Sequence, residues 1–211
     1  EEWARLAPVV EALAGLDVPL SIDTRHPGTM ARVIAAGASI INDISGFRTL
    51  EARAAVAGCD VGLVTMHMLG DSPATMQANP VYADVVAEVG RFLMDSRQAL
   101  LDAGVAPERI CLAHNLALYR GIPAWASVAP VLVGVSRKSM LGTITGQPVE
   151  RRLAASLAGA LAGVQMGATI VRVHDVPETV QALAVWTAIG LPAAAGSVHI
   201  GDGHSGRPAK E

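Results

Sequence analysis

The sequence has 211 residues, of which 51% are hydrophobic but only 3% aromatic, and its formal net charge is −3 at pH 7. This composition suits one domain with an aliphatic core. The balanced charge and the lack of an apolar run of about 18 residues give no sign of nucleic acid or membrane partners. Cys59 and Cys111 stand far apart, so we expect neither a disulfide nor a zinc site, as suits a cytoplasmic protein.

Predicted helices and strands alternate along the chain. It opens with an amphipathic helical pattern, and a buried strand that ends in an acid follows. Further helical patterns alternate with apolar runs, and a polar loop covers residues 69–82. The predicted helices cover residues 2–14, 29–36, 50–57, 83–103, 114–120, 150–166 and 177–188. The predicted strands cover residues 18–24, 39–43, 61–67, 109–112, 130–135 and 169–173. This alternation is typical of a parallel α/β sheet.

Five of the six predicted strands end in polar or charged side chains. They are Asp23, Asn42, His67, the run from Ser136 to Lys138, and Arg172 with His174. Ligands of parallel α/β proteins bind at the carboxyl ends of the strands, so we expect these groups to converge there. Taken singly, Asp23, Thr24 or Asn42 could instead be a helix cap.

These side chains suit a flat polar ring that carries a phosphate group. A carboxylate and an amide, Asp23 and Asn42, can bind the hydrogen-bond donors of a heterocycle. Arg172 and His174 share a face if they lie in a strand, and together they can hold a phosphate or pyrophosphate. Lys138 can serve the same anion or a ring acceptor. The sequence carries no nucleophile elbow, HExxH, P-loop or GxGxxG motif, so the chemistry would depend on positioning and charge stabilisation.

Several segments together resemble those of the dihydropteroate synthase family. They are Ser21-Ile22-Asp23-Thr24, Ile41-Asn42-Asp43-Ile44-Ser45-Gly46, Met66-His67-Met68, Pro73-Ala74-Thr75-Met76-Gln77, Gly134-Val135-Ser136-Arg137-Lys138-Ser139 and Arg172-Val173-His174-Asp175-Val176. The resemblance implies a pterin-binding (β/α)₈ TIM barrel domain over residues 1–190, whereas residues 191–211 are expected to form an irregular tail.

The same resemblance implies an activity. Such transferases condense 6-hydroxymethyl-7,8-dihydropterin diphosphate with 4-aminobenzoate, giving 7,8-dihydropteroate and pyrophosphate in folate biosynthesis. Mg²⁺ assists. The enzymes are cytoplasmic homodimers, and sulfonamides inhibit them.

Site roles carry over by position. The residues expected to bind the pterin are Asp23, Asn42, Ile44, Met66, Lys138 and Arg172. Ser139 would lie near aminobenzoate, and Arg172 and His174 would bind the diphosphate. Lys138, Arg172 and His174 would be the catalytic residues. The metal ligand is unknown, because the expected Asn belongs to a segment that this sequence lacks.

The sequence departs from the family pattern in two places. The first two βα units are absent, and so is the Asp-Pro-Gly loop expected after Leu112. We therefore expect six βα units, which cannot close an eight-stranded barrel. Either residues are missing from the sequence at these places, or the protein is truncated and inactive.

Two other interpretations stay open. One is a non-catalytic paralogue that keeps the fold for pterin binding. The other is a different pterin-handling barrel, such as a methyltetrahydrofolate methyltransferase, which is not expected to carry both the Ser-Arg-Lys-Ser and the Arg-Val-His-Asp-Val segments.

Overall fold

A computed structural model describes residues 1–70, 81–114 and 116–190. The predicted tail at 191–211 and most of the polar loop at 69–82 lie outside the described residues.

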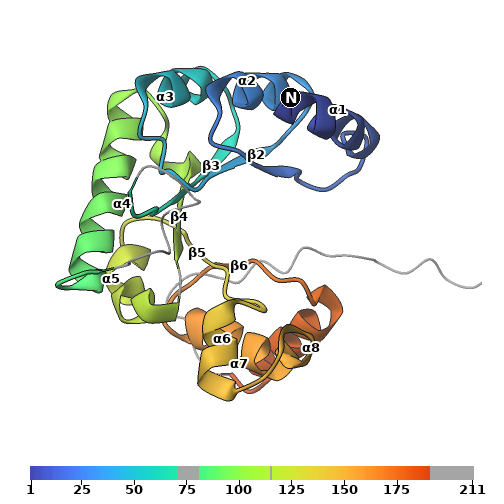
Figure 1. Cartoon of the computed structure of the whole chain (residues 1–211), viewed down its shortest axis with the longest axis vertical. Coiled ribbons are helices and arrows are strands. Elements are labelled where there is room, and N and C mark those ends of the chain that lie inside the picture. Colours follow the sequence, from blue (N-terminus) through green and yellow to red (C-terminus); the bar gives the residue numbers. More distant parts are fainter. Residues whose placement is uncertain (71–80, 115, 191–211) are drawn as a thin grey trace, which may run out of the picture.

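The described strands form one six-stranded parallel sheet in chain order. They are β1 (Ser21–Asp23), β2 (Ile40–Asp43), β3 (Gly62–Met66), β4 (Ile110–His114), β5 (Val131–Val133) and β6 (Ile170–Val171). The predicted order and direction are therefore confirmed. Figure 1 shows the sheet curled, with β1 and β6 as its two edges. This open, curved α/β sheet is the form expected of a partial barrel.

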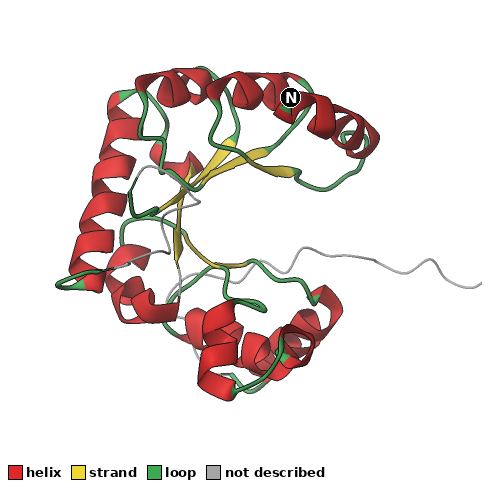
Figure 2. Cartoon of the chain, in the orientation of Figure 1, coloured by secondary structure: helices red, strands yellow, loops and turns green. Residues whose placement is uncertain are grey.

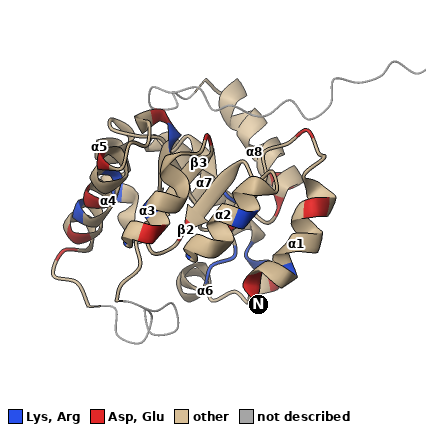
Figure 3. Cartoon of the chain, turned by 90° about the horizontal axis from the view of Figure 1, so that it is seen from above, with Lys and Arg blue, Asp and Glu red and all other residues tan. Residues whose placement is uncertain are grey.

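Helices cover the outside of the curve (Figure 2). They are α1 (Glu2–Leu13), α2 (Pro27–Ala35), α3 (Leu50–Ala57), α4 (Val85–Asp102), α5 (Ile122–Ala126), α6 (Ser139–Thr145), α7 (Leu153–Gln165) and α8 (Val176–Ala188). Short 3₁₀ helices cover Pro107–Arg109, Leu116–Gly121 and Val149–Arg151. In the part of the chain that the structure describes, no helix is long and apolar enough to cross a bilayer. Basic and acidic residues are interspersed along α1 and α4 (Figure 3).

Apart from shifts at the ends of several elements, the structure departs from the predicted elements in three places. In place of the helix expected over 114–120, the structure has a 3₁₀ helix followed by α5. Pro123 lies in the first turn of α5, where proline is tolerated. Strand β4 continues to His114, because Ala113 and His114 pair with β5. Helix α6 was not predicted. It directly follows Lys138, in the gap between the strand predicted over 130–135 and the helix predicted over 150–166.

The register of the sheet separates two faces. Partners in register share a face, and so do residues two apart in a strand. The face toward the helices carries the main core, including Ile22, Ile41 and Leu63. The inner face carries a second, smaller apolar cluster, which consists of Val64, Cys111, Ala113 and Leu132 with Ile40 and Met66. By register, Asp23 and Asn42 belong to this inner face.

Candidate active site

Three polar side chains from separate strand ends meet at the carboxyl edge of the inner face. The Nδ2 atom of Asn42 donates to Oδ2 of Asp23 at 2.9 Å, and Nη1 of Arg172 lies 3.7 Å from the same oxygen. Asp23 ends β1 and Arg172 follows β6, so this ion pair joins the two edges of the curled sheet. A Cβ at Gly134 would lie 3.3 Å from Nε of Arg172, so glycine leaves room for the guanidinium. The predicted convergence occurs for these three residues.

The Asp23–Asn42 pair retains hydrogen-bonding capacity. Burial raises the pKa of Asp23, although Arg172 and the hydrogen bond from Asn42 oppose this shift. Asn42 is only 3% exposed, and its Oδ1 atom finds no hydrogen-bond partner among the described residues. An unsatisfied buried acceptor costs about 1–3 kcal/mol. A ligand that brings an N–H donor to this oxygen would remove that cost.

Neither residue of this pair is a helix cap. The N-cap of α2 is His26, and that of α3 is Thr49. Thr24 does bond locally, because its Oγ1 accepts the backbone N–H of His26 at 3.2 Å. The capping interpretation is therefore wrong for Asp23 and Asn42, and their side chains face the inner surface instead.

A buried carboxylate that the sequence analysis did not single out shapes the loop after β2. Asp43 is fully buried, and its carboxylate accepts the backbone N–H groups of Ser45 (2.7 Å) and Phe47 (2.8 Å). The Ser45 hydroxyl also bonds to it. These bonds fix the half-buried Ile44 directly beyond Asn42. An Asp followed two residues later by Ser is a local turn signal that could have revealed this role.

At the end of β3, Met66 and His67 lie on opposite faces. Met66 packs against the inner apolar cluster. The His67 ring instead lies edge-on to Phe92 of α4, with the centroids 5.0 Å apart, and burial lowers its pKa. The prediction that His67 joins the polar strand ends is therefore wrong, since the alternation of the strand sends it toward the helices.

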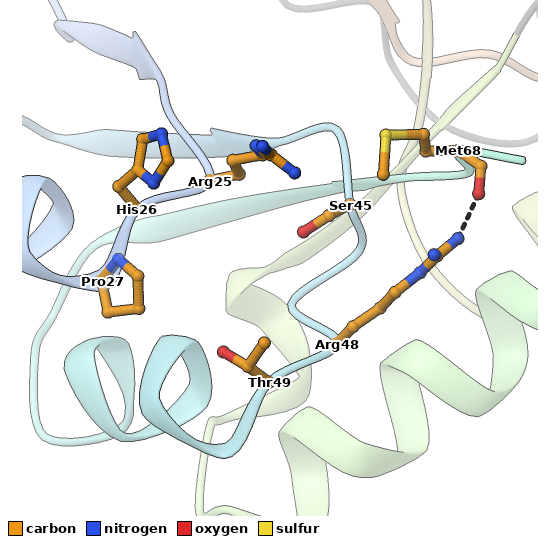
Figure 4. Close-up of a pocket in the computed structure, with 7 residues that line it drawn as sticks. All are labelled: Arg25, His26, Pro27, Ser45, Arg48, Thr49 and Met68. Carbon is orange, nitrogen blue, oxygen red and sulfur yellow. Dashed lines mark hydrogen bonds between the residues drawn. The ribbon is translucent and has the colours of Figure 1, made fainter. Parts of the chain in front are cut away.

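A cavity of about 450 Å³ lies at the carboxyl ends of β1 to β3, and Figure 4 shows its lining. The lining residues are Arg25, His26, Pro27, Ser45, Arg48, Thr49 and Met68. Arg48 donates to the carbonyl oxygens of Met68 and Gly70, and its guanidinium lies 4.9 Å from the Phe92 ring centroid. Arg48 thus ties the loop after β2 to the loop after β3. The cavity lining does not include Asp23 or Asn42.

The segment after β5 is joined to the segment after β6. Ser136 is 5% exposed, and its Oγ accepts the backbone N–H of His174 at 3.2 Å and lies 3.1 Å from His174 Nδ1. Arg137 forms an ion pair with Asp175, so this cation is directed toward α8. Strand β6 ends at Val171, which means that Arg172 and His174 do not share a strand face as predicted.

Lys138 and Ser139 stand at the start of α6. Lys138 is its N-cap residue and Ser139, which is exposed, is its first residue. Burial, assisted by the positive charge of Arg172, lowers the pKa of Lys138 to about 8. The positive charges of Lys138 and Arg172 therefore lie close enough to repel each other. The expectation that they bind one anion together with His174 stays a prediction.

The expected Mg²⁺ ion has no ready-made cluster of acidic, His or Cys ligands in the described part of the chain. Within 1–70, 81–114 and 116–190, no three His, Cys, Asp or Glu side chains gather as metal ligands. The role expected of Mg²⁺ stays a prediction.

Comparisons with known proteins agree on one family. A family model described as pterin binding enzyme matches residues 1–174. A dihydropteroate synthase from Neisseria meningitidis serogroup B is 44% identical over 208 residues, which cover 90% of this chain and 73% of that protein.

Solved structures that resemble this chain belong to the same family. Dihydropteroate synthase from Burkholderia cenocepacia, complexed with 7,8-dihydropteroate, superimposes with a TM-score of 0.81 at 48% identity, covering 90% of this chain and 74% of that one. The enzyme from Xanthomonas albilineans with 4-aminobenzoic acid gives 0.82 at 40% identity, covering 90% and 75%. That from Yersinia pestis with a sulfonamide drug gives 0.81 at 35% identity, covering 90% and 73%.

Proposed function

Because this chain belongs to the pterin binding enzyme family, we propose that it condenses 6-hydroxymethyl-7,8-dihydropterin diphosphate with 4-aminobenzoate. The products are 7,8-dihydropteroate and pyrophosphate. The observation that carries this proposal is the likeness to a dihydropteroate synthase solved with 7,8-dihydropteroate, at 48% identity. It favours a catalytic protein over a non-catalytic pterin-binding paralogue.

In this proposal the Asp23–Asn42 pair binds the pterin ring. The ionised carboxylate of Asp23 accepts the ring N–H and amino donors of the pterin, and Asn42 Oδ1 accepts a further N–H. The hydrogen bond between the two side chains holds both acceptors in place before the substrate binds. Ile44 and Met66 contribute apolar surface against the ring, since Met66 already packs on the inner apolar cluster.

Three basic side chains act near the diphosphate. Arg172 and His174 bind it, and Lys138 binds the pterin or the same anion. Together they stabilise the charge that develops as the bond between the pterin methylene carbon and the diphosphate oxygen breaks. The amine of 4-aminobenzoate, held near Ser139, then attacks the resulting pterin cation. A C–N bond forms, the amine loses a proton, and pyrophosphate leaves with the electron pair of the broken C–O bond.

The resemblance alone supports three further parts of the proposal. Mg²⁺ would neutralise charge on the diphosphate when bound. The protein would act as a homodimer in the cytoplasm. Sulfonamides would compete with 4-aminobenzoate, as the Yersinia pestis complex with a sulfonamide drug suggests.

The test is pyrophosphate release by the purified full-length protein with the pterin diphosphate, with and without 4-aminobenzoate. We expect release that depends on aminobenzoate and that matches the dihydropteroate formed. Tight binding of the pterin diphosphate without release would instead support the non-catalytic paralogue.

A further inference from the structure

Arg152, at the start of α7, holds the segment that carries Lys138 and Ser139. Its Nη1 donates to the backbone carbonyl oxygens of Arg137 (3.0 Å) and Lys138 (3.3 Å), and its Nε donates to that of Gln147 (3.0 Å). Lys138 immediately precedes α6, and Gln147 follows it. One guanidinium therefore fixes both ends of α6.

A second side chain of α7 completes this attachment. The Ser156 hydroxyl accepts the backbone N–H of Arg137 at 3.0 Å and donates to the carbonyl oxygen of Arg152 at 2.7 Å. Ser156 is only 4% exposed, so the bond is shielded from water. The N–H and the C=O of Arg137 are thus both bound by side chains at the start of α7, Ser156 and Arg152.

The backbone of Arg137 needs such support. Its φ angle is +57°, in the left-handed region that residues other than glycine seldom adopt. A strained conformation of this kind persists when the surrounding structure fixes it. Here the fixed residue directly precedes Lys138 and Ser139, so its conformation decides where these two side chains point.

The packing between α6 and Arg152 is also close. A Cβ atom at Gly142 would lie 2.3 Å from Nη2 of Arg152. Glycine at this position lets the guanidinium reach the carbonyl groups at both ends of α6.

We propose that Arg152 is a positioning residue that sets the placement of Lys138 and Ser139, with its larger effect on 4-aminobenzoate, the substrate held near Ser139. This role rests on the proposed function. Arg152 contacts backbone carbonyl groups rather than reacting atoms, so it acts through the residues that it holds. Ser139 is the aminobenzoate residue in our proposal, whereas the pterin is also bound by Asp23 and Asn42 on β1 and β2. Loss of Arg152 should therefore affect the two substrates unequally.

The test is the steady-state kinetics of Arg152→Ala in the full-length protein, with each substrate varied in turn. We expect the KM for 4-aminobenzoate to rise about tenfold or more, since small misplacements of binding groups have effects of this size. The KM for the pterin diphosphate should change by less than about threefold. Arg152→Lys should be intermediate, because a single ammonium lacks the fork geometry of the guanidinium.

Arg151→Ala is the matched control, because Arg151 is the exposed neighbour of the same charge, and it should behave as the wild type. Unchanged KM values in Arg152→Ala would overturn the positioning role. Equal increases in both KM values, together with a lower melting temperature, would also overturn it. If Arg152→Ala does not fold, Arg152→Lys decides by the same comparison of KM values. An inactive wild type would instead refute the proposed function itself.

Discussion

Replacing Asp23 by Asn tests pterin recognition without changing the size of the side chain. The carboxylate lies 2.9 Å from the Asn42 amide nitrogen and 3.7 Å from the Arg172 guanidinium. An Asn at this position would offer one oxygen and one NH₂ group. Its NH₂ would face either the amide nitrogen of Asn42 or the donors of the pterin, and each arrangement leaves donors unpaired.

The expected loss follows from the hydrogen bonds at stake. A hydrogen bond to a charged group contributes about 1.5–3 kcal/mol, and the proposed pterin complex makes two such bonds to Asp23. We therefore expect kcat/KM for the pterin diphosphate to fall about a hundredfold or more, which corresponds to about 2.7 kcal/mol or more.

Stability should change little in the same variant. The Asp23–Arg172 ion pair is half-exposed, and such pairs contribute about 0–1 kcal/mol. Burial raises the pKa of Asp23, so folding already disfavours the ionised form, and a neutral Asn relieves that cost. We expect a shift in melting temperature of no more than a few degrees, roughly the effect of 1 kcal/mol.

The assay is the steady-state rate of dihydropteroate formation, with a melting curve for each protein. Asp60→Asn is the control, because Asp60 is an exposed carboxylate next to the amino end of β3. A near-normal kcat/KM in Asp23→Asn would refute the role of Asp23 in binding the pterin.

Three further predictions address the anion site, its pH dependence and the loop after β2. His174→Ala should weaken pyrophosphate binding by about 1.5–3 kcal/mol, and an unchanged Kd in calorimetry would count against its role. Because the pKa of Lys138 is lowered to about 8, its ammonium loses the proton as the pH rises through that value. We expect kcat/KM to fall above about pH 8, and in Lys138→Arg, which stays charged, this fall should disappear; a flat wild-type profile would contradict the assignment. Gly46→Ala should destabilise the protein by about 1–3 kcal/mol, because the φ angle of Gly46 is +75° and an added Cβ would lie 2.7 Å from a ring of α4. Gly58→Ala, where the Cβ meets open space, should leave the stability unchanged. Equal denaturation midpoints for Gly46→Ala and Gly58→Ala would refute this.

Much of the fold was predictable because its signals are local. Buried apolar runs that end in polar residues gave the six parallel strands, and the rule for carboxyl ends brought Asp23, Asn42 and Arg172 together. The prediction for His67 was wrong because it relied only on the position of this residue at the end of the predicted strand. The alternation that puts Met66 on the inner face puts His67 on the other.

The rest of the site depends on contacts between distant segments. Arg137 and Lys138 are adjacent cations in the sequence, yet Arg137 forms an ion pair with Asp175, whereas Lys138 is a neighbour of Arg172. The backbone of Arg137 is left-handed, and the side chains of Arg152 and Ser156 support it. No local pattern around Arg137 encodes the positions of Arg152 and Ser156.

A crystal structure of the full-length protein with bound 7,8-dihydropteroate would test the central claim most directly. We expect the pterin ring within hydrogen-bond distance of Asp23 and of Asn42 Oδ1, with the aminobenzoate group beside Ser139. A product molecule bound instead in the cavity lined by Arg25 and Arg48, with Asp23 and Asn42 contacting no ligand, would contradict the account.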